Sequence, residues 1–331
     1  MAAPEWQLVA DIGGTNARFS ALLPGQLESR HQFFYTVAEH ADFIELLARL
    51  RTDIAAATGW QGAPSAACLA VACPADGPQI RFTNSHWQFS KTELVTALQS
   101  PVELINDFAA IAHGVTELSA DDVIQVGGDQ PRADSAIAVL GPGTGLGVSA
   151  VIPAGGHYAV VDGEGGHVGF APGDERQAAL LGVLQTRYGG HVSAERILSG
   201  SGLVTLYQSL GQLDAQPTPL SQAAQITAAA VDGSDRLAVA TVEQFCQIMG
   251  TVAGDLALTL GARGGVYLAG GVIPRFADIF VASQFRQYFQ NKGRFADYLA
   301  AIPVYLVVRE QLGLLGAAKY LHSLSSHSSN L

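Results

Sequence analysis

Short apolar runs, each followed by a glycine turn or by a segment with helical spacing, succeed one another along most of the chain. Residues 6–23 have the pattern of a strand, a glycine turn and a second strand. Residues 42–59 place apolar side chains at helical spacing and end at a glycine. Residues 65–77 are a continuous run of small apolar residues, typical of a strand that helices cover on both faces. This alternation predicts an open α/β sheet with helices on its faces.

The strand, glycine turn and strand of the first residues recur at 134–153. Further predicted elements follow: helices within 219–261, strands within 264–275 and 301–310, and a closing helix at 313–324. A chain of 331 residues exceeds the length at which a single hydrophobic core usually keeps growing. We therefore expect two α/β lobes, each opening with a glycine-turned hairpin.

Composition indicates a compact globular protein with few charges, since hydrophobic residues make up 48% and charged residues 14% of the chain. The net charge of −11 argues against nucleic acid and anionic membranes as partners, because both need clustered Lys and Arg. No apolar run is long enough for a membrane span, and no signal peptide precedes the first strand, so we expect a cytoplasmic protein. Three scattered cysteines predict buried free thiols in a reducing compartment.

Asn106 and Asp107 stand where an apolar strand end meets the start of a predicted helix. Both residue types are common helix N-caps, because their side chains satisfy N–H groups of the first turn. A carboxylate in this position could equally take a proton from a bound hydroxyl group. From these residues alone, Asp107 is either a cap or a general base.

Two glycine-rich turns have the composition of phosphate-binding loops. In the first, Gly13 and Gly14 let the backbone approach an anion, Thr15 adds a side-chain donor, and Asp11 can orient a metal-bound water. An ordinary glycine hairpin turn is the alternative. The second, GPGTGLG around Thr144, lacks the lysine of a Walker loop and leads into no clear helix.

Three further polar residues stand in segments that could bind a ligand. Glu164 and His167 lie among four glycines without helical periodicity, which is typical of a shaped binding loop. A solvated acid and a structural histidine are the alternatives. Glu195 is expected at or near a helix start, where the helix dipole alone could account for a carboxylate.

As a set, these motifs resemble those of bacterial glucokinases of the ATP-dependent hexokinase type, outside the ROK family. The matching segments occur in order: DIGGTNARFS, LINDFAAIAHG, GPGTGLGVSAVI, GEGGHVGFAP, HVSAERILSG and LAGGVIPR. The resemblance implies an actin-like ATPase (ribonuclease H-like) α/β fold, with the active site in a cleft between two lobes. In that family the last helix packs on the first lobe, which implies lobes of residues 1–117 plus 309–331 and of residues 118–308.

Carried over position by position, the resemblance makes Asp107 the catalytic base. The implied sugar contacts are Asn106, Asp107, Glu164, His167 and Glu195. The implied nucleotide contacts are Ala10, Asp11, Ile12, Gly13, Gly14, Thr15, Gly143, Thr144, Gly145, Gly270 and Gly271. The implied reaction is phosphorylation of D-glucose at the 6-hydroxyl by ATP, giving glucose 6-phosphate and ADP in the first step of glycolysis. Mg²⁺ bound through the nucleotide and a homodimer are implied as well.

One departure and several rival functions bear on this resemblance. ROK proteins carry a cysteine-rich zinc motif after their histidine, whereas residues 168–200 contain no cysteine, so we expect no structural zinc. The rival enzymes are kinases of fructose, mannose or N-acetylmannosamine. A sugar-sensing transcriptional regulator would need a DNA-binding module, for which we expect no room before residue 8. A non-catalytic actin-like ATPase, such as a chaperone, would have no use for the sugar-type acids.

Overall fold

The computed structural model describes residues 4–82 and 85–328, with side chains up to residue 325. The chain folds into two compact units. The first unit comprises the residues up to Leu118 together with those from Arg309 onward, and the second is Ser119–Val308. Each unit is built around a mixed sheet of its own.

The first unit arranges its main sheet in the order β3-β2-β1-β4-β7. Its strands are β1 (Gln7–Ile12), β2 (Asn16–Leu22), β3 (Gln32–Thr36), β4 (Ala66–Val71), β5 (Ile80–Arg81), β6 (Gln88–Phe89) and β7 (Val102–Asn106). Its helices are α1 (Phe43–Thr58), α2 (Lys91–Leu98), α3 (Asp107–Val115) and α11 (Leu312–Ser328), with a 3₁₀ turn η1 (Val37–Glu39). β1 pairs antiparallel with β2 and parallel with β4, which in turn runs parallel with β7. β5 and β6 form a separate small ladder.

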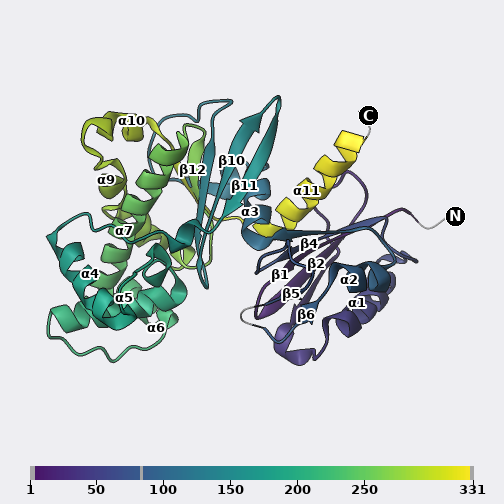
Figure 1. Cartoon of the computed structure of the whole chain (residues 1–331), viewed down its shortest axis with the longest axis horizontal. Helices are drawn as coiled ribbons and strands as arrows, with labels where there is room; N and C mark the ends of the chain where they lie inside the picture. Colours follow the sequence, from purple (N-terminus) through teal and green to yellow (C-terminus); the bar gives the residue numbers. More distant parts are fainter. Residues whose placement is uncertain (1–3, 83–84, 329–331) are drawn as a thin grey trace. The chain divides into compact units, whose positions relative to one another are not determined.

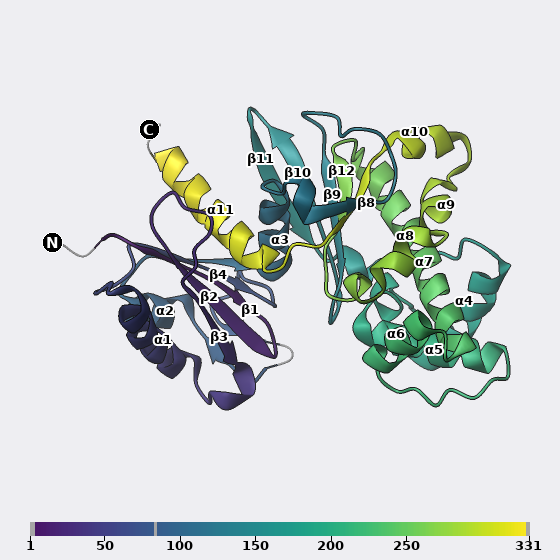
Figure 2. The same ribbon diagram turned by 180° about the vertical axis from the view of Figure 1, so that it is seen from behind.

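Alternate residues of β1 pack into two different apolar clusters, as the two-residue period of a strand requires. Leu8, Ala10 and Ile12 belong to the cluster that contains α1 and α2. Val9 belongs to the cluster that contains α3 and α11. Figures 1 and 2 show α11 running beside α3, with α1 and α2 together on the other side of the sheet. The first sheet is therefore covered on both faces.

The helix predicted over 42–59 is confirmed as α1. Asp42 caps it, because its side chain accepts a hydrogen bond of 2.9 Å from the N–H of Glu45. Gly59 ends it in the left-handed conformation, with φ of 74°, which glycine adopts without steric cost. Both helix boundaries therefore have a chemical cause that is visible in the sequence.

The second unit arranges its sheet in the order β11-β10-β9-β12-β13-β8. Its strands are β8 (Val123–Gln125), β9 (Ile137–Pro142), β10 (Leu146–Ala154), β11 (His157–Gly163), β12 (Gly265–Leu268) and β13 (Val304–Val307). Its α-helices are α4 (Glu175–Tyr188), α5 (Gly200–Leu213), α6 (Ala223–Asp232), α7 (Arg236–Leu260), α8 (Ala277–Ala282), α9 (Phe285–Gln290) and α10 (Ala296–Ala301). Its 3₁₀ turns are η2 (Ala120–Asp122), η3 (Gly165–His167), η4 (Ala194–Arg196), η5 (Ile273–Phe276) and η6 (Gly293–Phe295).

The two sheets repeat one strand arrangement. In the second unit β9, β10 and β11 form an antiparallel meander, as β1, β2 and β3 do in the first. β12 and β13 then run parallel with β9, as β4 and β7 do with β1. The two predicted glycine-turned hairpins of the α/β fold are confirmed, although in the second unit η2 and β8 precede the hairpin.

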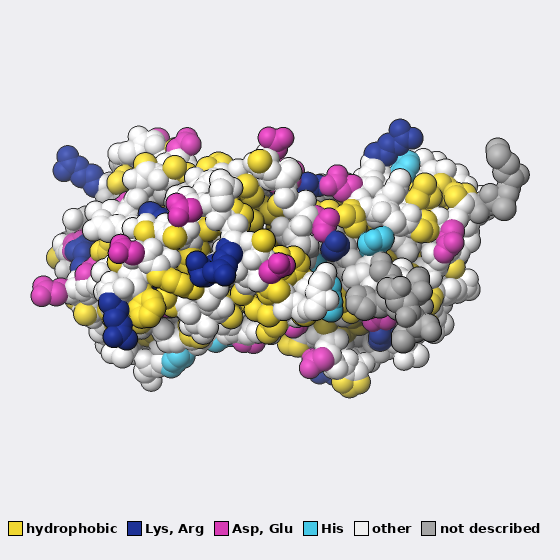
Figure 3. Space-filling model, turned by 90° about the horizontal axis from the view of Figure 1, so that it is seen from above, with side chains coloured by type: hydrophobic (Ala, Val, Ile, Leu, Met, Phe, Trp, Pro, Cys, Tyr) yellow, Lys and Arg dark blue, Asp and Glu magenta, His cyan; other side chains and the backbone are white. Residues whose placement is uncertain are grey.

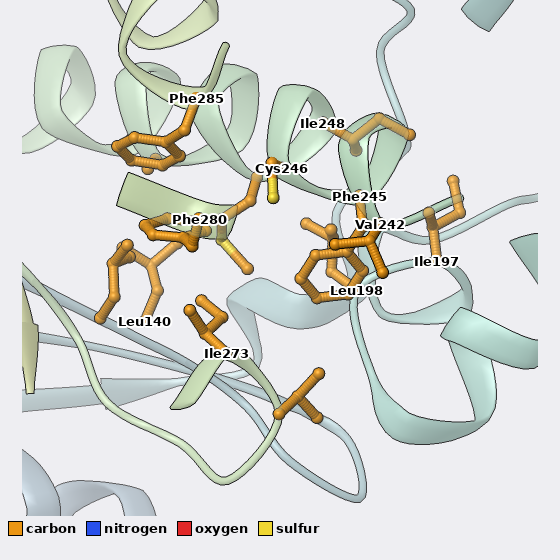
Figure 4. Close-up of a cluster of buried hydrophobic side chains, with 14 of the residues drawn as sticks. Leu140, Ile197, Leu198, Val242, Phe245, Cys246, Ile248, Ile273, Phe280 and Phe285 are labelled. Carbon is orange, nitrogen blue, oxygen red and sulfur yellow. The ribbon is translucent and has the colours of Figure 1, made fainter. Parts of the chain in front are cut away.

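The core of the second unit gathers around α7, the long helix that lies along its sheet in Figure 1. In Figure 4, Cys246 of α7 lies among apolar side chains from several segments, including Phe280 and Phe285. Cys68, Cys73 and Cys246 are all buried and free, and burial is the main cause that raises the pKa of each thiol. The predicted buried thiols are therefore confirmed.

Surface charge and helix hydropathy agree with the composition. On the face drawn in Figure 3, Lys and Arg side chains are scattered among acidic ones and form no single patch in the described part of that face. Across residues 4–82 and 85–328, each helix falls short of the length and apolar content that crossing a membrane requires.

Candidate active site

The carboxyl ends of β1, β4 and β7 meet at one edge of the first unit's sheet. In the parallel register Ile12 lies beside Val71, and Val71 lies beside Asn106. Neighbouring strands are about 4.8 Å apart, so the ends of β1 and β7 are separated by roughly 10 Å. The first glycine loop follows β1 and Asp107 follows β7, so both open at this edge.

Asn106, and not Asp107, caps α3. Its Oδ1 accepts hydrogen bonds from the N–H groups of Phe108 at 2.8 Å and of Ala109 at 3.3 Å. Its Nδ2 donates to the carbonyl oxygen of Cys73 at 3.4 Å. Asp107 is the first residue of the helix, where the helix dipole favours a carboxylate. The interpretation of Asp107 as the cap is therefore wrong, because its neighbour already performs that function.

In the first glycine loop, one glycine N–H closes the turn by a hydrogen bond, and the next two backbone N–H groups have no acceptor in the described chain. The N–H of Gly13 donates to the carbonyl of Asn16 at 2.9 Å. Within residues 4–82 and 85–328, the N–H groups of Gly14 and Thr15 donate to no protein acceptor. Two successive free amides in a turn form a concave site for an anion.

Ala10 and Ile12, expected among the nucleotide contacts, have fully buried side chains in the sheet. Their side chains pack in the cluster with α1 and α2, and the carbonyl of Ile12 accepts a hydrogen bond from Ala72 N–H at 3.1 Å. In the structure, these two residues hold β1 in the sheet, and the first glycine loop starts at the end of this strand.

Asp11 lies at the end of β1 opposite Arg18 of β2. Nη1 of Arg18 is 3.2 Å from Oδ2 of Asp11, and the two residues are paired in the hairpin register. Burial raises the pKa of Asp11, while the neighbouring Arg18 partly lowers it. Arg18 is not among the residues expected from the sequence, although the hairpin register that pairs Asp11 with this position could have identified it.

In the second unit, the glycine loop between β9 and β10 is fastened to the segment that carries Glu195. The N–H of Leu146, at the end of the loop, donates to Oε2 of Glu195 at 2.9 Å. The carbonyl of Gly143, at its start, accepts from the N–H of Gly200 at 2.8 Å. A Cβ on Gly145 would overlap the same Glu195 oxygen, so a side chain there would have to displace the carboxylate. The loop is therefore held at both ends.

This second loop leaves the same pair of amides uncommitted as the first. The N–H of Gly143 closes the turn on the carbonyl of Gly145 at 2.8 Å. In the part of the chain that the structure describes, the N–H groups of Thr144 and Gly145 have no protein acceptor. The glycine turn of each hairpin thus carries two successive amides that could bind an anion.

Glu164 precedes η3 and His167 is its last residue, and this turn packs against β10 through its glycines. A Cβ on Gly165 or Gly166 would overlap atoms of β10, so the turn can approach the strand only because both residues are glycine. The side chains of Glu164 and His167 are 78% and 60% exposed, and Oε2 of the acid is 3.7 Å from Nε2 of the histidine. Both side chains are therefore accessible to a ligand from solvent.

The Glu195 segment lies directly beside that of His167. Gly169 forms an antiparallel bridge with Ser193. Next to this bridge, the N–H of Ala194 donates to the carbonyl of Val168 at 2.9 Å. Nε2 of His191 is 3.1 Å from the carbonyl oxygen of His167. The second unit therefore brings together the segments of Glu164, His167 and Glu195, next to its glycine loop.

Gly270 and Gly271 follow β12 and lie beside the end of β9. The N–H of Val272 donates to the carbonyl of Pro142 at 3.1 Å. A Cβ on Gly270 would come within 2.5 Å of that same carbonyl oxygen, whereas a Cβ on Gly271 would meet nothing within 4 Å. Close packing against Pro142 therefore explains why residue 270 is a glycine. Gly271 borders open space near the glycine loop that follows β9.

Metal ligands do not cluster in the described residues, where no group of three or more His, Cys, Asp or Glu could hold an ion. The expected absence of structural zinc stays a prediction.

Comparison with known proteins identifies a family by sequence and by structure. A family model described as Glucokinase matches residues 8–324. A glucokinase of Hahella chejuensis is 42% identical over 328 residues, which cover 99% of this chain and 100% of that protein. The crystal structure of a glucokinase from an Antarctic psychrotroph matches with a TM-score of 0.84 at 34% identity, over 96% of this chain and 99% of that one. A glucokinase of Balamuthia mandrillaris, crystallised with glucose, matches in fold with a TM-score of 0.79 at 22% identity, over 96% and 94% of the two chains.

Proposed function

Because this chain belongs to the bacterial glucokinase family, outside the ROK family, we propose that it transfers the γ-phosphoryl group of ATP to the 6-hydroxyl of D-glucose with Asp107 as general base. Glucokinase activity, the actin-like ATPase fold and the use of ATP follow from membership in this family. The proposal adds the residues that carry the reaction and the hydroxyl that receives the phosphoryl group.

The observation that carries this proposal is the shared strand edge of the first unit. Asp107 and the uncommitted amides of Gly14 and Thr15 follow strands whose ends lie in register. The cap of α3 is supplied by Asn106, so the Asp107 carboxylate is not needed for the cap. The proposed base and the proposed phosphate site thus follow two strands of one sheet, with β4 between them.

In the proposed step, the Asp107 carboxylate takes the proton of the 6-hydroxyl while that oxygen bonds to the γ-phosphorus. The bond from the γ-phosphorus to the β–γ bridging oxygen breaks, and ADP leaves with that electron pair. Phosphoryl transfer depends mainly on positioning and on charge stabilisation, which the surrounding groups supply.

The proposed sugar contacts have complementary hydrogen-bonding capacities. The carboxylates of Glu164 and Glu195 can accept bonds from neighbouring hydroxyl groups, and His167 adds a ring nitrogen. Asn106 differs from the others, because its oxygen is already used by the helix cap. Its Nδ2 has a second hydrogen, so we propose that Asn106 donates to a sugar hydroxyl.

The proposed nucleotide contacts fit a phosphate chain that is held by backbone amides. The amides of Gly14, Thr15, Thr144 and Gly145 lack protein acceptors within the described chain, and neither loop contains a lysine. The Asp11 carboxylate would hold a water of the Mg²⁺ that accompanies the nucleotide, and this ion would neutralise phosphate charge. The open space at Gly271 suits the nucleoside, with Gly13, Gly143 and Gly270 shaping the backbone around it.

We also propose that the two units are the two lobes, with boundaries at 117/118 and 308/309, and that one glucose molecule is contacted by residues of both. We propose further that the protein is a homodimer, that it acts in the cytoplasm, and that it catalyses the first step of glycolysis. The buried free thiols suit a reducing compartment. Light scattering coupled to gel filtration tests the dimer, and limited proteolysis tests the boundaries.

A sugar panel tests the proposed reaction. ADP release should be measured with D-glucose, 6-deoxy-D-glucose, fructose, mannose and N-acetylmannosamine. We expect fast release with glucose, and inhibition by 6-deoxy-D-glucose without phosphorylation of that sugar, because it lacks the acceptor oxygen. A phosphorylated 6-deoxy sugar would overturn the proposed position of transfer, and preference for N-acetylmannosamine would overturn the substrate.

A further inference from the structure

Glu195 has a second contact that the binding of a sugar does not require. One of its carboxylate oxygens, Oε2, accepts the N–H of Leu146 at 2.9 Å, at the point where the glycine loop 143–145 enters β10. A carboxylate has two oxygens and several acceptor positions. The side chain can therefore hold the loop through one oxygen and present the other to a ligand.

The backbone beneath Glu195 is fixed to the same loop. Oγ of Ser199 donates to the carbonyl of Glu195 at 2.9 Å and also caps α5 by accepting the N–H of Gly202 at 2.9 Å. The next residue, Gly200, donates its N–H to the carbonyl of Gly143 at 2.8 Å. The segment 195–200 thus contacts the loop at two places, one through a side chain and one through the backbone.

Gly145 makes the side-chain contact possible. A Cβ on this residue would overlap Oε2 of Glu195, so any side chain here would displace the carboxylate from the Leu146 amide. Gly145 also carries one of the two amides that have no protein acceptor in the described chain. The anion site and the Glu195 contact therefore share one short piece of backbone.

We propose that Glu195 couples the binding of glucose to the binding of the ATP phosphates, because its carboxylate is shared between the sugar and the Leu146 amide that closes the glycine loop. The inference rests on the proposed function, in which Glu195 contacts glucose and the Thr144 and Gly145 amides contact phosphate. The coupling uses groups of the second unit alone.

The physical basis of the coupling is the cost of ordering a partly exposed side chain. Hydroxyl groups bound to the free oxygen of Glu195 fix its rotamer, and this in turn fixes the hydrogen bond to Leu146 and the shape of the loop. The ordering is then complete before the phosphates bind, so the second ligand binds to a loop that has already been ordered. Coupling of this kind is reciprocal, and allosteric couplings are typically about 5- to 150-fold in affinity.

The measurement is the dissociation constant of Mg²⁺–adenylyl imidodiphosphate, a non-hydrolysable ATP analogue, by calorimetry without and with saturating glucose. We expect the wild-type enzyme to bind the analogue at least about fivefold more tightly with glucose. Glu195→Gln should weaken glucose binding but keep most of this ratio, since the amide oxygen still accepts the Leu146 N–H. Glu195→Ala should lose the contact, and its ratio should fall to about one.

Gly145→Ala is the second variant, because it moves Glu195 off the loop without removing the carboxylate. Its ratio should also approach one even though both ligands still bind. Gly182→Ala in α4 is the matched control, since its new methyl group meets nothing within 4 Å, and it should behave as wild type. A wild-type ratio of one, or an unchanged ratio in both Glu195→Ala and Gly145→Ala, overturns the inference. Failure of the wild-type protein to bind glucose or the analogue at all overturns the proposed function instead.

Discussion

Replacing Asp107 with asparagine removes the proposed base and leaves the helix cap in place. The two hydrogen bonds that begin α3, at 2.8 and 3.3 Å, both end on the Asn106 oxygen and are untouched by this substitution. The new amide has nearly the size of the carboxylate but cannot take the proton of a hydroxyl group. The substitution therefore separates the chemistry of Asp107 from the N-cap of the helix.

The expected effects follow from these contacts. Positioned general-base catalysis contributes about 10²- to 10⁴-fold, so kcat of Asp107→Asn should fall by at least about 100-fold. Its free energy of unfolding should drop by less than about 1 kcal/mol, the value of a carboxylate near a helix N-terminus. Asn106→Ala should show the reverse balance, because losing an N-cap costs about 0.5–2 kcal/mol.

The assay combines kinetics with denaturation for both variants. An ADP-coupled assay at saturating ATP gives kcat and KM for glucose, and urea unfolding gives the free energy of unfolding. Asn106→Ala should keep a larger share of kcat than Asp107→Asn and should raise KM, since it also loses a donor to the sugar. A stable Asp107→Asn enzyme with nearly wild-type kcat would refute the assignment of the base. An Asn106→Ala protein as stable as wild type would refute the assignment of the cap.

Three further substitutions test other groups of the site. Asp11→Asn should raise the thermal unfolding temperature at pH 7 and abolish most activity. Burial raises the pKa of Asp11 above its ordinary 3.8, because the buried carboxylate is less stable when charged. The protonated Asp11 of the wild type therefore contributes its full stability below about pH 4, and this contribution is lost as pH rises through the folded-state pKa. The gap from wild type should shrink between pH 7 and pH 4, and a gap that widens on acidification contradicts this. Gly14→Val should fill the first anion site and weaken ATP binding in calorimetry with glucose binding little changed; undiminished ATP affinity would exclude the site. Glu164→Gln should raise KM for glucose, because a neutral amide accepts fewer hydroxyl bonds, and a normal KM would remove this residue from the sugar contacts.

Local chemistry made a large part of the fold predictable. The hairpin of β1 and β2, the capped helix α1 with Gly59, and the second hairpin of β9 and β10 each depend on neighbours in the sequence. Apolar period and turn residues therefore predicted them directly. The family motifs then identified the two glycine loops and the acidic residues of the candidate site.

Contacts between distant segments could not be predicted in the same way. The Leu146–Glu195 hydrogen bond joins residues 49 positions apart and depends on how η4 packs beside β10. The choice between Asn106 and Asp107 as the cap needed the backbone geometry, since both residue types suit the position. The close approach of α11 to α3 rests on Gly316, whose Cβ would overlap the Ala110 carbonyl, and helical periodicity does not reveal that contact.

The placement of α11 determines the order in which the newly synthesised chain can fold. This last helix supplies Leu314, Ala317, Ala318 and Leu321 to the cluster that also contains Val9 and Ile105. At about 5–20 residues per second, roughly 10 to 40 s separate the synthesis of β7 from that of α11. During this interval α3 is the only helix available to that face of the first sheet among the described residues of the cluster, and the part that α11 covers stays exposed. The second unit, in contrast, is continuous in sequence and can complete its core. The nascent chain therefore exposes part of an apolar face until its final helix leaves the ribosome.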